Sequence, residues 1–125
     1  MHDNLRRKRI MKILLQAITA ALLFLAVSEA QAMDGNDLLA GYNAYKRVTG
    51  GNAVSTDAYQ AGLFDGYVSG VFDSAVGIAL CAPSDVKSGQ IQKVVGQFLE
   101  TNPAVLQRAA VLLATQALMK AFPCR

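Results

Sequence analysis

The chain has 125 residues, of which 53% are hydrophobic and 17% are charged, and its formal net charge is +3 at pH 7. Five of the 12 basic residues and two of the nine acidic residues precede residue 33, so residues 33–125 carry seven of each. This balanced segment lacks the basic face on which nucleic-acid binding depends. The sole histidine is His2, so residues 33–125 offer no imidazole for a catalytic triad, a general base or a metal site.

Residues 1–32 follow the order of a secretory signal peptide. A basic block, LRRKRIMK, precedes an apolar run from Ile13 to Val27, and small residues follow at Ala30 and Ala32. The apolar run is shorter than the roughly 18–20 residues of a spanning helix, which disfavours a permanent membrane anchor. We expect cleavage after Ala32, general secretion to the periplasm, and one mature domain over 33–125 without membrane contact. A translation start at Met11 stays open.

The chain has two cysteines, Cys81 and Cys124. In an oxidising compartment they are expected to form one disulfide, which would stabilise so small a domain by about 4 kcal/mol in the chain-entropy model. The alternative, two free reactive thiols, needs activating neighbours. Neither cysteine lies in a CxxC motif or beside a histidine, so the disulfide is favoured.

The first two helices of the mature chain are expected between Asp34 and Leu80. The first begins at a capping residue, Asp34 or Asn36, and ends where glycines interrupt the pattern at Gly50. A calcium loop opening at Asp34 is disfavoured, because Tyr45 stands where such a loop needs a glutamate. The second helix begins near Ser55 or Thr56 and continues to about Leu80. The apolar face of the first helix consists of Leu38, Leu39, Tyr42 and Tyr45.

Two further helices are expected after the loop that follows Leu80. The third begins near Ser88 with a one-sided apolar pattern and ends at Asn102. Asn102 as cap and Pro103 as first residue then start the last helix, which ends at Phe122, and a kink or break near Gln107 is left open. No β-alternating segment of useful length occurs. The sequence therefore predicts an all-α fold, a small bundle of four to five helices stapled by one disulfide.

Four glycines interrupt the pattern of the second predicted helix. Each helix-interior glycine costs roughly 0.5–1 kcal/mol relative to alanine. At 100° per residue all four lie on one side of the helix, opposite the bulky side chains. Such a bare face allows another backbone to approach closely, so we expect close helix packing there, against a helix of the same chain or of a second copy. Exposure of the bare face to solvent is the alternative. These glycines are Gly62, Gly66, Gly70 and Gly77.

Catalytic groups are scarce in residues 33–125. Asp65 and Asp73 are the only candidate catalytic carboxylate pair on a single element, but eight residues place them about 12 Å apart along a helix. Glycosidase pairs lie about 5–9.5 Å apart. No histidine can activate a serine, and no phosphate-binding or dinucleotide fingerprint is present. We therefore expect a binding protein without enzymatic activity, cofactor or metal.

The order of several motifs resembles the Rap/Tai family of small secreted immunity proteins associated with type VI secretion. The motifs are MDGNDLL, GYVSGVFDSA, LCAPSDVKSGQ, VVGQFLETNP and QALMKAFPC, and they span nearly the whole mature chain. The resemblance implies an all-helical periplasmic protein, often a homodimer, that binds a toxin delivered by neighbouring cells. In the best-known branch of the family this toxin is a peptidoglycan amidase.

The resemblance also bears on single residues. Cys81 and Cys124 match the cysteine pair that flanks the last two helices of the family. Many relatives have a second pair, at positions that correspond to Tyr42 and Phe64, which implies that aromatic packing replaces a disulfide here. An inhibitor needs a rigid surface rather than a catalytic group. The expected partner surface is the loop Ala82–Ser88, with the turn at Thr101–Pro103 as second choice, and the candidate contact residues are Ser84, Asp85, Lys87 and Asn102.

A second hypothesis is a periplasmic helical stress protein, or an acid-activated chaperone, without a cognate toxin. Such a chaperone would become disordered and bind client proteins at low pH. An enzyme is a third and weaker hypothesis, because the usual catalytic groups are missing.

Overall fold

The computed structural model describes residues 1–25 and 32–125, which belong to two separate units, Met1–Gln31 and Ala32–Arg125. Helix α1, His2–Leu25, forms the first unit. Neither α1 nor any other described helix is long and apolar enough to cross a membrane. The division between the units falls next to the predicted cleavage site. Ala30 lies outside the described residues, and cleavage after Ala32 stays a prediction.

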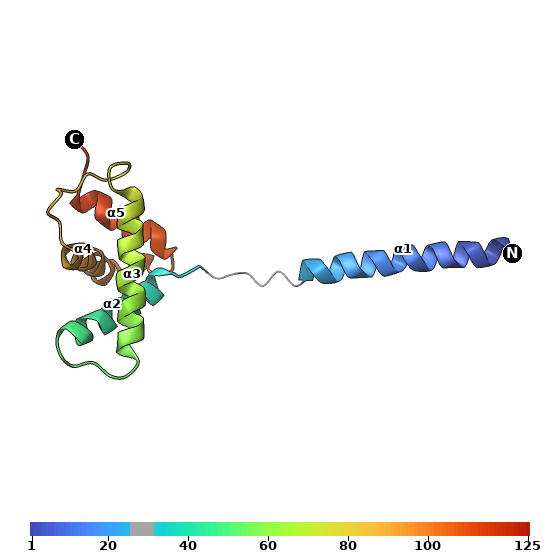
Figure 1. Cartoon of the computed structure of the whole chain (residues 1–125), viewed down its shortest axis with the longest axis horizontal. Coiled ribbons are helices and arrows are strands. Elements are labelled where there is room, and N and C mark those ends of the chain that lie inside the picture. Colours follow the sequence, from blue (N-terminus) through green and yellow to red (C-terminus); the bar gives the residue numbers. More distant parts are fainter. Residues whose placement is uncertain (26–31) are drawn as a thin grey trace. The chain divides into compact units, whose positions relative to one another are not determined.

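The second unit consists of four α-helices and one short 3₁₀ helix. Figure 1 shows α3 crossing the unit, with the α2–α3 loop at one end and the C-terminus near the other. No strand occurs in the described part of the chain. The predicted all-α bundle and its single disulfide are therefore confirmed. The elements are α2 (Gly35–Thr49), α3 (Asp57–Ala75), α4 (Ser88–Thr101), η1 (Pro103–Val105) and α5 (Ala110–Ala121).

Helix α2 begins where the sequence predicts, at the Asp34 cap. The Asp34 carboxylate accepts a hydrogen bond from the backbone N–H of Asp37 at 3.0 Å, and the Asp37 carboxylate accepts one from the N–H of Asp34 at 3.2 Å. This reciprocal box satisfies two donors that a helix start otherwise leaves unpaired. Because the Asp37 N–H stabilises the charged form, the pKa of Asp34 is lowered. The capping hydrogen bonds account for the positions of these two acidic residues.

One apolar core lies between the four helices. Each helix contributes the residues of one face, and Leu80, from the segment after α3, is also fully buried. Burial of large side chains contributes about 1.5–3 kcal/mol each to folding. The core therefore depends on all four helices at once. Its largest fully buried apolar side chains are Phe64, Leu38, Leu80, Leu99, Leu113 and Leu118.

Two predicted boundaries are wrong. Helix α3 ends at Ala75, not near Leu80, because Leu80 reaches the core from a turn. The last helix does not begin at Pro103, which starts only η1, because α5 begins at Ala110. The break near Gln107 that the sequence left open is therefore present. The break has a clear cause: backbone carbonyl groups between η1 and α5 accept hydrogen bonds from N–H groups at the start of α2. Gly35 N–H donates to Arg108 O at 3.0 Å and Asn36 N–H donates to Leu106 O at 3.1 Å.

The predicted glycine face does not pack against another helix of the same chain. A Cβ atom built on Gly62, Gly66 or Gly70 would meet no heavy atom within 4 Å, and all three residues are exposed on α3. Gly77 lies in the turn after α3, not in the helix. The expectation of close packing within the chain is therefore wrong for these residues, because the three neighbouring helices cover the bulky side of α3. Contact with a second copy stays a prediction.

Close packing occurs at three other glycines. A methyl group on Gly96 of α4 would overlap the ring of Tyr42, and one on Gly41 of α2 would lie 2.9 Å from Cβ of Phe64. On Gly35 it would lie 2.7 Å from the Leu106 carbonyl oxygen. These glycines let α2 approach α3, α4 and the connection before α5. They stand singly in the sequence, so no spacing pattern marks them.

Candidate binding surface

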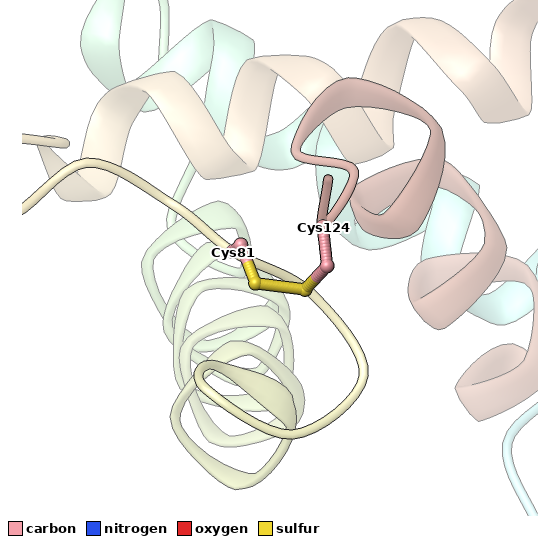
Figure 2. Close-up of a disulfide and its surroundings, with 2 residues drawn as sticks. All are labelled: Cys81 and Cys124. Carbon is pink, nitrogen blue, oxygen red and sulfur yellow. A yellow bond between two sulfur atoms is a disulfide. The ribbon is translucent and has the colours of Figure 1, made fainter.

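The disulfide joins the segment after α3 to the C-terminus. Cys81 and Cys124 have Cα atoms 4.8 Å apart, and Figure 2 shows the bridge between the loop and the chain end that follows α5. The Cys81 N–H also donates to Phe122 O at 2.9 Å. Phe122 in turn packs edge-on against Phe72 of α3, with ring centroids 6.2 Å apart. One end of the unit is thus held by a covalent bond, a hydrogen bond and an aromatic contact.

A compact turn, Val76–Leu80, precedes the disulfide. Three backbone N–H groups, of Ile78, Ala79 and Leu80, donate to the carbonyl of Ala75 at 2.8–3.2 Å, and Gly77 N–H donates to Leu80 O at 2.8 Å. Gly77 has φ +78°, a conformation that residues with a Cβ rarely adopt. The side chain of Leu80 is buried in the core and anchors the turn there. The conformation of the turn is therefore fixed by contacts within the chain.

The predicted partner loop, Ala82–Ser88, follows the disulfide. Ser84, Asp85 and Lys87 are all exposed, and none of these side chains makes a hydrogen bond or ion pair within the described residues. The loop ends at the start of α4, where the Lys87 N–H donates to the side-chain oxygen of Gln90 at 2.7 Å. These three polar groups are therefore available to a partner.

Asn102 does not join this surface. It follows the last residue of α4, and a helix of that length separates it from Lys87 by about 20 Å. Its side-chain amide donates to the Phe98 carbonyl at 2.7 Å and does not cap η1. Asn102 instead lines an open groove of about 630 Å³ between α4 and α5. The sequence thus predicts residues at two opposite ends of α4, and only Ser84, Asp85 and Lys87 form one surface.

A polar cluster behind the loop was not predicted from the sequence. Gln92 of α4 is 0% exposed, and its side-chain N–H groups donate to the Asp65 carboxylate and, at 3.2 Å, to Ser69 Oγ of α3. The Ser88 hydroxyl lies 3.2 Å from the Gln92 side-chain oxygen and 3.4 Å from Asp65 Oδ1. These bonds join the first turn of α4 to α3. They thereby fix the end of the Ala82–Ser88 loop.

An ion pair holds the N-terminal end of α3, where the α2–α3 loop joins the helix. Asp57 is 2% exposed and accepts two hydrogen bonds from the Arg47 guanidinium, at 2.6 and 2.9 Å, and one from the Val54 N–H at 2.9 Å. The Arg47 hydrogen bonds, followed by the Val54 bond, lower the pKa of Asp57 to about 2. This contact closes the α2–α3 loop and leaves Asp57 without a free oxygen for chemistry.

The described residues hold no group of three His, Cys, Asp or Glu side chains that could bind a metal. Asp65, one member of the rejected carboxylate pair, is held by Gln92. What the geometry offers is a rigid end of the unit, where the turn Val76–Leu80, the disulfide and the loop Ala82–Ser88 follow one another. These are the features of a small disulfide-bonded helical protein whose surface is suited to binding another macromolecule.

Comparison with known families places the chain within one of them. The family model of Rap1a immunity proteins matches residues 34–124, which covers the helical unit from the Asp34 cap to Cys124. The chain belongs to the Rap1a immunity protein family, as its motif order implies. A comparison with the curated proteins gives no match.

Proposed function

We propose that this protein acts in the periplasm as the immunity protein against a type VI effector. It binds the effector and blocks its activity, so that the producing cell survives toxin delivered by its neighbours. The effector is proposed to be a peptidoglycan-degrading enzyme of the amidase type. The observation that carries the proposal is the match to the Rap1a immunity family over residues 34–124.

The arrangement of the helical unit supports an inhibitory role without catalysis. Protein inhibitors bind tightly when a preformed surface loses little conformational freedom on binding. Here the Cys81–Cys124 bridge, the Cys81 N–H bond to Phe122 O and the Gln92 cluster fix both ends of the loop Ala82–Ser88. The polar side chains of Ser84, Asp85 and Lys87 are proposed to contact the effector.

The exposed glycine face of α3 supports homodimer formation. Gly62, Gly66 and Gly70 leave the helix backbone open on that side, and Tyr59 and Leu63 stand exposed beside them. A second copy could place a helix directly against this face. We therefore propose that the protein forms a homodimer through this face of α3, a surface other than the effector-binding loop.

The proposal is tested with the product of a hydrolase gene located beside this one. The purified enzyme should bind the purified protein, and its hydrolysis of peptidoglycan should stop at equimolar inhibitor. Deletion of the immunity gene should cause self-intoxication, and expression with an intact export signal should rescue growth. Expression of residues 33–125 in the cytoplasm serves as the control and should not rescue. Absence of any such neighbouring gene, or of binding, would overturn the proposal.

A further inference from the structure

Ile78 stands out at the tip of the turn after α3. The residue is 83% exposed, more than any other exposed large hydrophobic residue of 32–125; Tyr59 and Val54 follow at 69% and 62%. Val76 beside it is also exposed. An exposed isoleucine on a loop is ordinary by itself. Its position on a fixed turn is what distinguishes this one.

The turn that carries Ile78 has little freedom to fold the side chain away. The Ile78 N–H donates to Ala75 O at 3.1 Å, and Leu80 on the far side of the tip is fully buried. Cys81, the residue after Leu80, is held by the disulfide to Cys124 (Figure 2). Residues that dominate binding energy are apolar anchors that enter a partner pocket, ringed by polar groups that exclude water. An anchor already held in place loses little entropy on binding.

We propose that Ile78 is the apolar anchor of the effector-binding surface and enters an apolar pocket of the effector, with Ser84, Asp85 and Lys87 as the polar rim. This inference rests on the proposed function. The disulfide connects anchor and rim, because Cys81 lies between the turn and the Ala82–Ser88 loop. In the proposed surface Ile78 supplies the apolar centre and the three polar side chains supply the border, the composition that protein interfaces share.

Two other occupants of the tip are a bilayer and a second copy of this chain. A bilayer would gain little, since even a whole myristoyl chain gives only marginal membrane binding, and an isoleucine side chain is much smaller. A second copy would receive Ile78 in the open groove between α4 and α5. The sedimentation measurement below distinguishes this occupant from the effector.

The test compares Ile78→Asp with Val54→Asp, which places the same charge at an exposed apolar position of the α2–α3 loop. Each variant is purified with its disulfide intact, and the dissociation constant for the purified neighbouring hydrolase is measured by biolayer interferometry. We expect Ile78→Asp to weaken binding at least tenfold and Val54→Asp less than twofold. Ile78→Leu, which keeps an apolar side chain of similar size, should retain most of the parent's affinity. All three variants should keep the circular-dichroism spectrum of the parent.

The outcomes separate this inference from the proposed function. If the parent protein does not bind the hydrolase, the proposed function fails and this inference fails with it. If the parent binds and Ile78→Asp binds equally well, only the anchor role of Ile78 is overturned. If Ile78→Asp loses self-association in sedimentation velocity while hydrolase binding is kept, the occupant is a second copy and the inference is wrong. Should Ile78→Asp fail to fold, Ile78→Ala decides, with at least fivefold weaker binding expected.

Discussion

The rings of Tyr42 and Phe64 pack against each other with centroids 5.3 Å apart and planes tilted by 46°. This contact joins α2 to α3, and Tyr45 adds a second ring 5.7 Å from Phe64. The family resemblance implies a second cysteine pair of many relatives at the positions of Tyr42 and Phe64. The packing of these two rings is confirmed, and it fills the space that Gly41 and Gly96 leave open. That it replaces a disulfide stays a prediction.

Gly96→Ala tests this packing. The added methyl group would overlap the Tyr42 ring, and overpacking of a core typically costs about 1–3 kcal/mol. We expect the free energy of unfolding, measured by urea titration, to fall by that amount. Gly66→Ala is the matched control, because its Cβ meets open space and the better helix propensity should add about 0.5–1 kcal/mol. Equal effects at both glycines would contradict the packing described here.

The glycine face of α3 is tested by Gly66→Leu. A Cβ atom at this position meets no heavy atom within 4 Å and the residue is exposed, so the fold of the isolated chain should persist with an unchanged or higher melting temperature. If a second copy packs on this face, the leucine separates the helices and the dimer dissociates. Sedimentation velocity over a concentration series measures this, with Leu112→Ala on α5 as a control. A parent protein that is monomeric at every concentration would contradict dimer formation through α3.

Removal of the disulfide should destabilise the helical unit strongly. Loss of a native disulfide from a small secreted domain typically costs about 2–5 kcal/mol, so Cys81→Ser combined with Cys124→Ser should lower the free energy of unfolding by that range. The parent treated with a phosphine reductant should match the double variant. The reductant should leave the double variant unchanged. A double variant as stable as the parent would show that the bridge is dispensable for folding.

The Asp57–Arg47 pair predicts a specific pH dependence. The pKa of Asp57 is about 2 in the folded chain, below its ordinary value of 3.8. A lowered carboxyl pKa stabilises the folded state above the unfolded pKa, and the contribution disappears as the pH falls through the folded value. Asp57→Asn should therefore be less stable than the parent at pH 6, and the gap should close toward pH 2.

Urea titrations at several pH values measure this gap. Asp73→Asn changes an exposed aspartate at the other end of α3 and should alter stability by less than about 0.5 kcal/mol at each pH. A gap for Asp57→Asn that is the same at pH 6 and pH 2 would contradict the assigned role. The same series shows whether the parent unfolds at pH 2–3, as the acid-chaperone hypothesis requires.

Gln92→Leu tests the buried cluster behind the loop. Leucine fills a similar volume but leaves the half-buried Asp65 carboxylate and Ser69 without their Gln92 donor. Loss of a typical hydrogen bond costs about 0.5–1.5 kcal/mol. We expect the stability to fall by that amount and amide exchange in the first turn of α4 to accelerate. Gln97→Leu, at an exposed position of the same helix, should change neither. Unchanged exchange in Gln92→Leu would exclude a role in fixing the loop.

The sequence alone determined the features that depend on neighbours along the chain. The Asp34 cap and the start of α4 at Ser88 follow from local hydrogen bonding and apolar spacing, which the residues themselves carry. The pairing of Cys81 with Cys124 needed only two cysteines and an oxidising compartment. The order of motifs was enough to indicate the family.

Only the tertiary structure decided which surfaces meet. The bare side of α3 is visible in the sequence, but the other three helices pack on its bulky side, so the closely packed glycines are Gly35, Gly41 and Gly96. The break before α5 arises because α2 captures the carbonyls of Leu106 and Arg108, two groups far from α2 in sequence. The burial of Gln92 and the exposure of Ile78 are decided in the same way. Local spacing indicates which side of a helix is apolar, but which segment covers that side depends on contacts between distant parts of the chain.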